Sequence, residues 1–193
     1  MVNLPTKFTI HDLALFPDDE KRYEVIDGEL IVTRSPHWNH QKVGGRLYAA
    51  LDNWTFSEAG FGEAVPSAGI VFDDENSVET DGTWVADPER LMQIMDEAGH
   101  LTEAPDLVIE SLSPGRKNER RDKELKVRLY SVRGVKEYWL VDWRTERLEI
   151  YRRQDAQLVL TATLLSGDVL RSPLLPRFEL DLSRIFARGK RRG

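Results

Sequence analysis

The 193-residue sequence predicts an α/β protein in which a mixed β-sheet is flanked by helices. Long amphipathic helical patterns alternate with short β-prone runs, and two pairs of these runs are predicted to form β-hairpins. The predicted order is helix, strands, strand, helix, strand, strand, which differs from the repeating βαβ order of a purely parallel sheet. An α/β sandwich with additional β-hairpins follows from these observations.

The β-hairpins are predicted from local turn chemistry. Residues 23–26 and 29–32 are β-prone and flank Asp27-Gly28, which is the strongest short hairpin signal that a sequence offers. Residues 136–142 and 147–152 form a second predicted hairpin, which further strands at 158–165 and near 178–182 follow.

Two long helices are predicted from apolar periodicity. Residues 39–58 carry apolar side chains at helical spacing, and Gly60 ends the pattern. Residues 120–132 form the second helix, with Gly134 as its C-terminal stop. Its predicted inward side chains are Leu125, Leu129 and Val132. Shorter helices are expected after Thr9, whose capping box includes Asp12, and over 88–99.

Between these helices lies a group of short strands. Residues 62–66, 69–72 and 78–86 should be neighbouring strands because turn residues separate them. Residues 107–112 read as a strand buried on both faces, since the run is apolar apart from Glu110 and Ser111. One domain is expected, with a core over 8–153, C-terminal strands over 158–182 and a basic tail at 187–193.

The composition narrows the class of protein. With 40% hydrophobic and 31% charged residues, the chain is typical of a folded cytoplasmic protein, and no apolar run is long enough to span a membrane. The N-terminal segment lacks the features of a signal peptide. Because the sequence has no cysteine, any metal ligands must be oxygen or imidazole groups, which favours hard cations.

The net charge of -6 counts against a protein that mainly coats DNA. Basic residues are nevertheless clustered at 116–121 and 188–192, and acidic metal ligands themselves contribute negative charge. Whether the chain can bind DNA therefore depends on the local electrostatic potential and not on the net charge. A basic tail by itself is more often simply solvated.

Glu110 is the first candidate site residue, because a carboxylate in a strand that is apolar on both faces needs a cation nearby. Asp106 shares its face but lies roughly 13 Å away at about 3.3 Å per residue, too far to share a metal. Asp81 is the better partner, since its run could pair with the Glu110 strand. Two such carboxylates could hold Mg²⁺ or Mn²⁺. The alternative is that Glu110 pairs with a lysine or arginine.

A second constellation follows that strand. Asp122, Lys126 and Tyr130 are spaced four residues apart and therefore share one helical face. In metal-assisted phosphodiester hydrolysis, Lys126 could orient or deprotonate water and neutralise phosphoryl charge, with Lys123 as a weaker substitute. The alternative is an exposed ion pair between Asp122 and Lys126.

Glu24 and His40 are secondary candidates. Each could reach a common cleft, although isolated residues of these types are more often structural. The aromatic residues Trp84, Tyr138, Trp139 and Trp143 are expected to serve core or hairpin packing rather than base stacking.

Together, four segments resemble the Uma-type putative restriction endonuclease family. They are residues 23–30, residues 105–114, the spacing of Asp122, Lys126 and Tyr130, and residues 134–142. The resemblance covers roughly Phe8 to Arg153. It implies the restriction-endonuclease-like PD-(D/E)XK fold and magnesium-dependent DNA cleavage.

By this resemblance, Asp81 and Glu110 correspond to the acidic metal ligands and Lys126 to the lysine, displaced onto the following helix. Glu24 and His40 match polar positions near the cleft. The sequence departs from the superfamily pattern at Thr80, where proline is usual, and at Leu112, where lysine is usual.

The sequence therefore predicts a Mg²⁺- or Mn²⁺-dependent endodeoxyribonuclease in which Asp81 and Glu110 hold the metal. A catalytically inactive binding module with a nuclease fold is the main alternative, which the net charge and Leu112 favour. A carboxylate-pair hydrolase acting on sugars ranks last, because an aromatic-lined acid pair is not found. Cleavage of both DNA strands would favour a homodimer.

Overall fold

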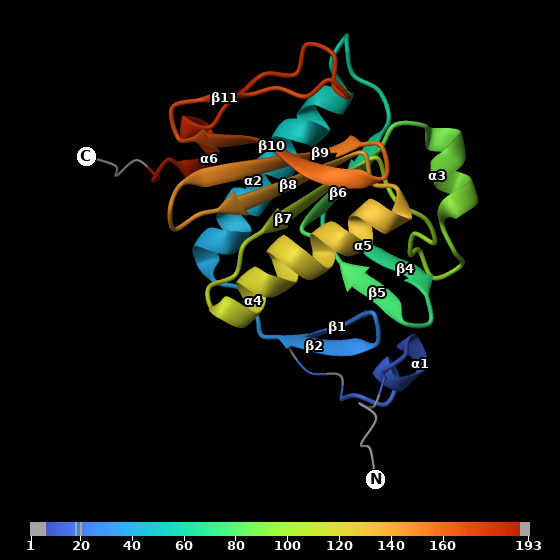
Figure 1. Cartoon of the computed structure of the whole chain (residues 1–193). Helices are drawn as coiled ribbons and strands as arrows, with labels where there is room; N and C mark the ends of the chain where they lie inside the picture. The colour runs from blue at the N-terminus through green and yellow to red at the C-terminus, as the bar shows by residue number, and fades with distance from the viewer. Residues whose placement is uncertain (1–6, 18, 20, 190–193) are drawn as a thin grey trace.

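The computed structural model describes residues 7–17, 19 and 21–189. A six-stranded mixed sheet, in the order β10-β9-β8-β7-β6-β3, lies beside a four-stranded antiparallel sheet in the order β2-β1-β5-β4. Figure 1 shows helix α2 on one side of the larger sheet and the helix running from α4 to α5 on the other. The predicted α/β fold with a mixed sheet flanked by helices is confirmed.

The elements are, in chain order, α1 (Ile10–Leu13), β1 (Arg22–Ile26), β2 (Glu29–Thr33), α2 (Trp38–Thr55), β3 (Glu63–Val65), β4 (Gly69–Asp73), β5 (Asn76–Glu79), β6 (Gly82–Val85), α3 (Pro88–Ile94), β7 (Leu107–Ser111), α4 (Arg116–Arg120), the π-helical segment η1 (Arg121–Leu125), α5 (Lys126–Arg133), β8 (Glu137–Asp142), β9 (Arg147–Gln154), β10 (Gln157–Leu165), β11 (Val169–Leu170), β12 (Leu180–Asp181) and α6 (Ser183–Phe186).

The first predicted hairpin is present as β1 and β2. Asp27 and Gly28 have φ angles of 53° and 78°, the left-handed conformation that a two-residue turn matched to the strand twist requires. The second predicted hairpin is β8 and β9, and β10 adds to it antiparallel.

The strands predicted as neighbours over 62–86 instead divide between the two sheets. β4 and β5 pair in the smaller sheet, whereas β3 and β6 pair in the larger one. The run 78–86 is therefore not a single strand. It breaks at Thr80, which is buried and bonds through its N–H to the carbonyl of Ala68, and the chain crosses there from one sheet to the other.

One core fills each face of the larger sheet. The α2 side chains Val43, Leu47 and Leu51 pack with alternate residues of β6 to β9, among them Trp84 and Trp139. The opposite faces of β7 and β8 pack against α5 and the smaller sheet. The predicted packing role of Trp84, Tyr138 and Trp139 is thus confirmed.

The second long helix differs from the prediction in its start and its buried face. It begins at Arg116 rather than Arg120 and contains the π-helical segment η1. Val132 is 77% exposed, so its predicted inward position is wrong, whereas Leu129 is buried. Lys126, Leu129 and Tyr130 are buried on one face of α5, and Val132 lies about 120° around the helix from Lys126, which places it off that face. Gly134 ends the helix with φ of 97°, as predicted.

Three smaller differences concern the ends of elements. Helix α3 stops at Ile94 instead of near Gly99, because Met95 turns into an isolated β-bridge with Leu101. The final strand is limited to β12, which pairs with β11. Of the predicted basic tail, residues 190–193 lie outside the described residues.

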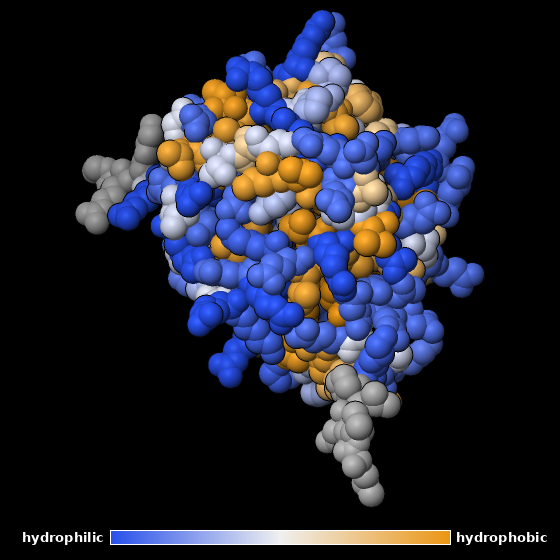
Figure 2. All heavy atoms as spheres, viewed as in Figure 1, coloured by the Kyte–Doolittle hydropathy of each residue, from blue (hydrophilic) through white to orange (hydrophobic). Residues whose placement is uncertain are grey.

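The surface on the side of α4 and α5 is mostly hydrophilic, with apolar side chains in small separate groups (Figure 2). No helix in the described part of the chain is long and apolar enough to cross a bilayer.

Candidate active site

The pairing of β6 with β7 brings Asp81 level with Glu110. Gly82 pairs with Ile109 in an antiparallel register, so the residue before β6 faces the residue after Ile109. The N–H of Asp81 donates to the carbonyl of Ile109 at 3.1 Å, and the N–H of Ser111 donates to Asp81 Oδ2 at 2.7 Å. The two carboxylates expected to lie on adjacent chain segments therefore do so.

The predicted helical face converges on Glu110. Lys126 Nζ lies 2.7 Å from Glu110 Oε1 and 2.9 Å from Glu24 Oε1, and the hydroxyl of Tyr130 donates to Glu110 Oε1 at 2.9 Å. The Lys126 side chain is 1% exposed and Asp122 is fully buried, so the alternative of an exposed ion pair is wrong. The predicted pairing of Glu110 with a lysine is present.

Asp122 pairs with its neighbour Arg121 instead of Lys126. Arg121 Nε and Nη2 lie 2.5 and 3.0 Å from the two oxygens of Asp122, a bidentate arrangement that fixes the guanidinium. Arg121 Nη1 also lies 4.0 Å from Glu24 Oε2. Both side chains belong to the π-helical segment, and π segments often occur at functional sites.

A cavity of about 220 Å³ opens over these groups. Among the residues that the structure describes, its charged lining contains four cationic side chains and three carboxylates: Lys21, Arg22, Arg34 and Arg121, and Glu79, Asp81 and Glu110. The local charge is therefore more favourable to an anionic ligand than the net charge of the chain. Lys126 and Glu24 lie behind the lining, where Lys126 contacts Glu110 from within the core.

Arg22 connects two of the lining carboxylates. Its Nη2 lies 2.9 Å from Glu79 Oε1, and its Nη1 lies 3.6 Å from Asp81 Oδ1. Arg22 and Arg121 were not predicted as site residues from the sequence. In the sequence, Arg22 differs from an ordinary surface arginine only by its place at the start of a hairpin, and Arg121 only by its place beside Asp122. The contacts that bring each of them to the cavity are made with residues far away in the sequence.

His40 lies on the other side of Asp81, with Nε2 3.6 Å from Asp81 Oδ2. Burial lowers the pKa of His40, although Asp81 opposes this shift, so the imidazole is neutral at pH 7. Its Nδ1 is buried without a hydrogen-bond partner, and the same is true of Ser111 Oγ. The structure therefore places His40 beside Asp81, one of the two predicted metal ligands.

The buried carboxylates differ in their ionisation. Burial raises the pKa of Glu110 to about 8, and the charges of Asp81, Glu24 and Asp122 add to this effect while Lys126 opposes it. For Glu24, burial acts in the same direction, but Lys126 and Arg121 hold the pKa below its usual value. Burial lowers the pKa of Lys126, but Glu110 and Glu24 outweigh it and raise the pKa, so the lysine is a cation at pH 7.

The donor set suits a hard divalent cation that also binds substrate. Within the described ranges, no three histidine, aspartate or glutamate side chains are grouped as a complete metal site. Mg²⁺, however, is commonly held by one or two carboxylates together with water and substrate phosphate. Asp81 and Glu110 supply two such carboxylates at the cavity, and the raised pKa of Glu110 shows that nearby cations compensate its charge incompletely.

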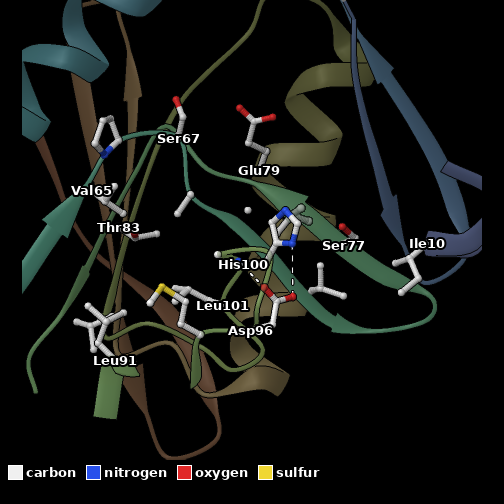
Figure 3. A pocket seen from close by; sticks show the side chains of 18 of the residues that line it. Ile10, Val65, Ser67, Ser77, Glu79, Thr83, Leu91, Asp96, His100 and Leu101 are labelled. Atoms are coloured by element: carbon white, nitrogen blue, oxygen red, sulfur yellow. Dashed lines mark hydrogen bonds and ion pairs between the residues drawn. The ribbon is translucent and has the colours of Figure 1, made fainter. Parts of the chain in front are cut away.

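A larger cavity of about 930 Å³ lies between the two sheets (Figure 3). His100 points into this cavity, and its Nδ1 lies 3.5 Å from Asp96 Oδ2. Within the described part of the chain, its lining includes Glu63 and Glu79 but no lysine or arginine. A phosphate backbone therefore finds better charge complementarity in the smaller cavity, with which this one shares Glu79.

The α/β fold, with carboxylates, a lysine and arginines gathered at one cavity, is the arrangement that the predicted family resemblance implies. The family model of Uma2, described as "Putative restriction endonuclease", matches residues 9–183, and the chain belongs to this family. The predicted family resemblance is confirmed.

A solved structure supports the same fold. It is the crystal structure of a putative nuclease belonging to DUF820 from Anabaena variabilis ATCC 29413, with a TM-score of 0.70 and 18% sequence identity. The similarity covers 93% of this chain and 97% of that chain. No curated protein matches the sequence.

Proposed function

We propose that this protein is a Mg²⁺- or Mn²⁺-dependent endonuclease that hydrolyses DNA phosphodiester bonds at the smaller cavity. The observation that carries the proposal is the pair of carboxylates from Asp81 and Glu110, brought level by the β6–β7 register and surrounded by arginine and lysine side chains. Carboxylates for a metal and cations for a phosphate are the two requirements of metal-assisted phosphodiester hydrolysis.

Asp81 and Glu110 would hold the metal ion, which when bound supplies Lewis acidity and lowers the pKa of water. Asp81 is oriented for this role by the Ser111 N–H and stands beside neutral His40. Arg22 and Arg121 present guanidinium groups to the same cavity, where they would bind phosphate oxygens.

Lys126 acts by charge rather than as a base in this proposal. Its raised pKa keeps the ammonium protonated at pH 7, and the group contacts Glu110 from behind the cavity. Lys126 would thus favour the ionised form of Glu110 and add positive potential beneath the phosphate. Glu24 would hold Lys126 in place through the 2.9 Å contact.

A catalytically inactive binding module is the second candidate, and the direct pairing of Lys126 with Glu110 favours it. Thermal shift and calorimetry with Mg²⁺ and Mn²⁺ separate the two candidates. We expect the metals to stabilise the wild type, and Asp81→Asn and Glu110→Gln to lose this response. Unchanged binding by both variants would refute the site, whereas a wild type that does not respond would favour the inactive module.

Cleavage of both strands would also favour a two-fold homodimer, in which each subunit addresses one strand. Light scattering on the purified chain tests this part of the proposal, and a monomer at working concentration would contradict it.

A further inference from the structure

Trp38 is a large aromatic side chain that is 81% exposed at the edge of the proposed active site. It is the first residue of α2 and follows Pro36 by two positions, and Pro36 lines the smaller cavity together with Arg34. The core does not explain an aromatic side chain in this position, because Trp38 belongs to neither apolar cluster.

The backbone that carries Trp38 is held from both sides. His37, the residue before it, caps α2 by accepting the Asn39 N–H at Nδ1 over 3.0 Å. The His37 ring also stacks on Trp143, with centroids 4.5 Å apart and an interplanar angle of 4°. Trp38 is therefore displayed on a fixed support, which limits the entropy lost when a ligand binds to it.

Cationic groups also lie near this end of α2. Arg34 is exposed at the cavity, and α4 begins three residues after Ser113, another lining residue. The turn that carries Trp143 is tied to α4, since Arg144 Nη2 donates to Glu119 at 3.0 Å. Figure 1 shows α4 and the beginning of α2 at the same end of the larger sheet, on its opposite faces. The exposed basic side chains of α4 are Arg116, Lys117 and Arg120.

We propose that Trp38 stacks on an unpaired base of a single-stranded nucleic acid whose backbone follows these cations into the cavity. Aromatic side chains beside a cationic track are the general means of binding single strands, and stacking tolerates any base. The inference rests on the proposed function for the nature of the ligand, and it adds a preference for single-stranded or unwound substrate. A base inside an intact duplex does not expose the ring face that Trp38 requires.

Phe56 provides a matched control on the same helix. It is 85% exposed and directly follows the last residue of α2, about 27 Å from Trp38 at 1.5 Å per residue, and it does not line the cavity. Replacing either residue by alanine removes an equally exposed aromatic ring. Only the change at Trp38 should affect binding beside the cavity.

The test is fluorescence anisotropy with a fluorescein-labelled oligo(dT) and a duplex of the same length, in EDTA to prevent cleavage. We expect Trp38→Ala to weaken oligo(dT) binding about tenfold, within the 1–3 kcal/mol range for one stacked base. Trp38→Phe should retain most of the affinity, Phe56→Ala should match the wild type, and the duplex should show little dependence on Trp38.

Equal affinities for Trp38→Ala and Phe56→Ala would overturn the inference, and so would equal losses on the single strand and the duplex. Trp38 could instead contact a second copy of this chain, and sedimentation of the same variants tests that alternative. If Trp38→Ala abolishes self-association and leaves oligo(dT) binding unchanged, Trp38 belongs to a contact between copies, and the inference is wrong.

Cleavage assays distinguish a failure of this inference from a failure of the proposed function. A wild type that cleaves DNA but binds oligo(dT) without need of Trp38 contradicts the stacking alone. A wild type that binds through Trp38 but never cleaves contradicts the nuclease and leaves the stacking intact.

Discussion

Replacing Lys126 by methionine should strongly destabilise the protein at neutral pH. The Lys126 ammonium is the cation closest to Glu24 and Glu110, at 2.9 and 2.7 Å, and all three side chains are buried. Methionine keeps a similar length but removes the charge. A buried carboxylate that loses its partner is costly, typically by about 3–5 kcal/mol.

The magnitude can be worked from the ionisation of the site. With a pKa of about 8, Glu110 is already largely protonated at pH 7, so the ionised partner of Lys126 is Glu24. Without Lys126, folding must protonate Glu24, which costs about 3 to 4 kcal/mol at pH 7 for a glutamate with an ordinary pKa in the unfolded chain. The cost should shrink by about 1.4 kcal/mol for each pH unit below 7.

The assay is urea unfolding in EDTA at pH 5, 6 and 7, with Lys123→Met as the matched control. Lys123 lies in the same helix and contacts Glu149 at 2.6 Å, but its side chain is 38% exposed, so its loss should cost at most about 1 kcal/mol. The double variant Lys126→Met with Glu24→Gln should recover most of the loss, because no buried carboxylate then has to be protonated.

Two results would refute this reasoning. One is a Lys126→Met variant that is destabilised no more than Lys123→Met at pH 7. The other is a loss that does not vary with pH, or that Glu24→Gln fails to relieve.

Three further predictions concern the same site. Arg22→Gln should lower the cleavage rate roughly 10- to 100-fold, measured by initial rates after thermal melts have shown that the variant is folded. An unchanged rate would remove Arg22 from the proposed mechanism. The pKa of Glu110 is raised from 4.5 to about 8, so its contribution to stability in EDTA is fully present below pH 4.5 and is lost as the pH rises through 8, by up to about 1.4 kcal/mol per pH unit. Glu110→Gln should flatten this pH dependence in urea titrations, and an identical slope in the variant would contradict the assignment. Gly44→Ala should lower the free energy of unfolding by about 1–3 kcal/mol, since the new Cβ would lie 2.8 Å from Ser111 Oγ. In Gly45→Ala the new Cβ meets open space, and the change should stabilise α2 by up to about 1 kcal/mol. Similar melting curves for both variants would refute the close packing of α2 on β7.

Local sequence signals predicted the parts of the fold that depend on neighbouring residues. Asp27-Gly28 specifies its turn by itself, and the i, i+4 spacing alone aligns Lys126 with Tyr130. The anomaly of Glu110 in an apolar strand was enough to require a cation nearby, and the structure provides Lys126.

The missing parts depend on non-local geometry. The run 78–86 was predicted as one strand although Asp81-Gly82 interrupts its β-prone residues, and the chain changes sheets at Thr80, which sets Asp81 opposite Glu110. Arg121 reaches the cavity within a π-helical segment that no helical periodicity indicates. Arg22 becomes part of the site only because β1 pairs with β5, which brings Glu79 within reach.

The most direct test of the proposed nuclease is incubation of the purified wild type and Asp81→Asn with supercoiled, linear and single-stranded DNA. Each substrate is followed on a gel in Mg²⁺, Mn²⁺ or EDTA, after melting curves have shown that the variant is folded. We predict cleavage by the wild type that requires the metal and is absent in Asp81→Asn. Cleavage that persists in EDTA or in the folded variant, or a wild type that cleaves none of these substrates, would contradict the proposal.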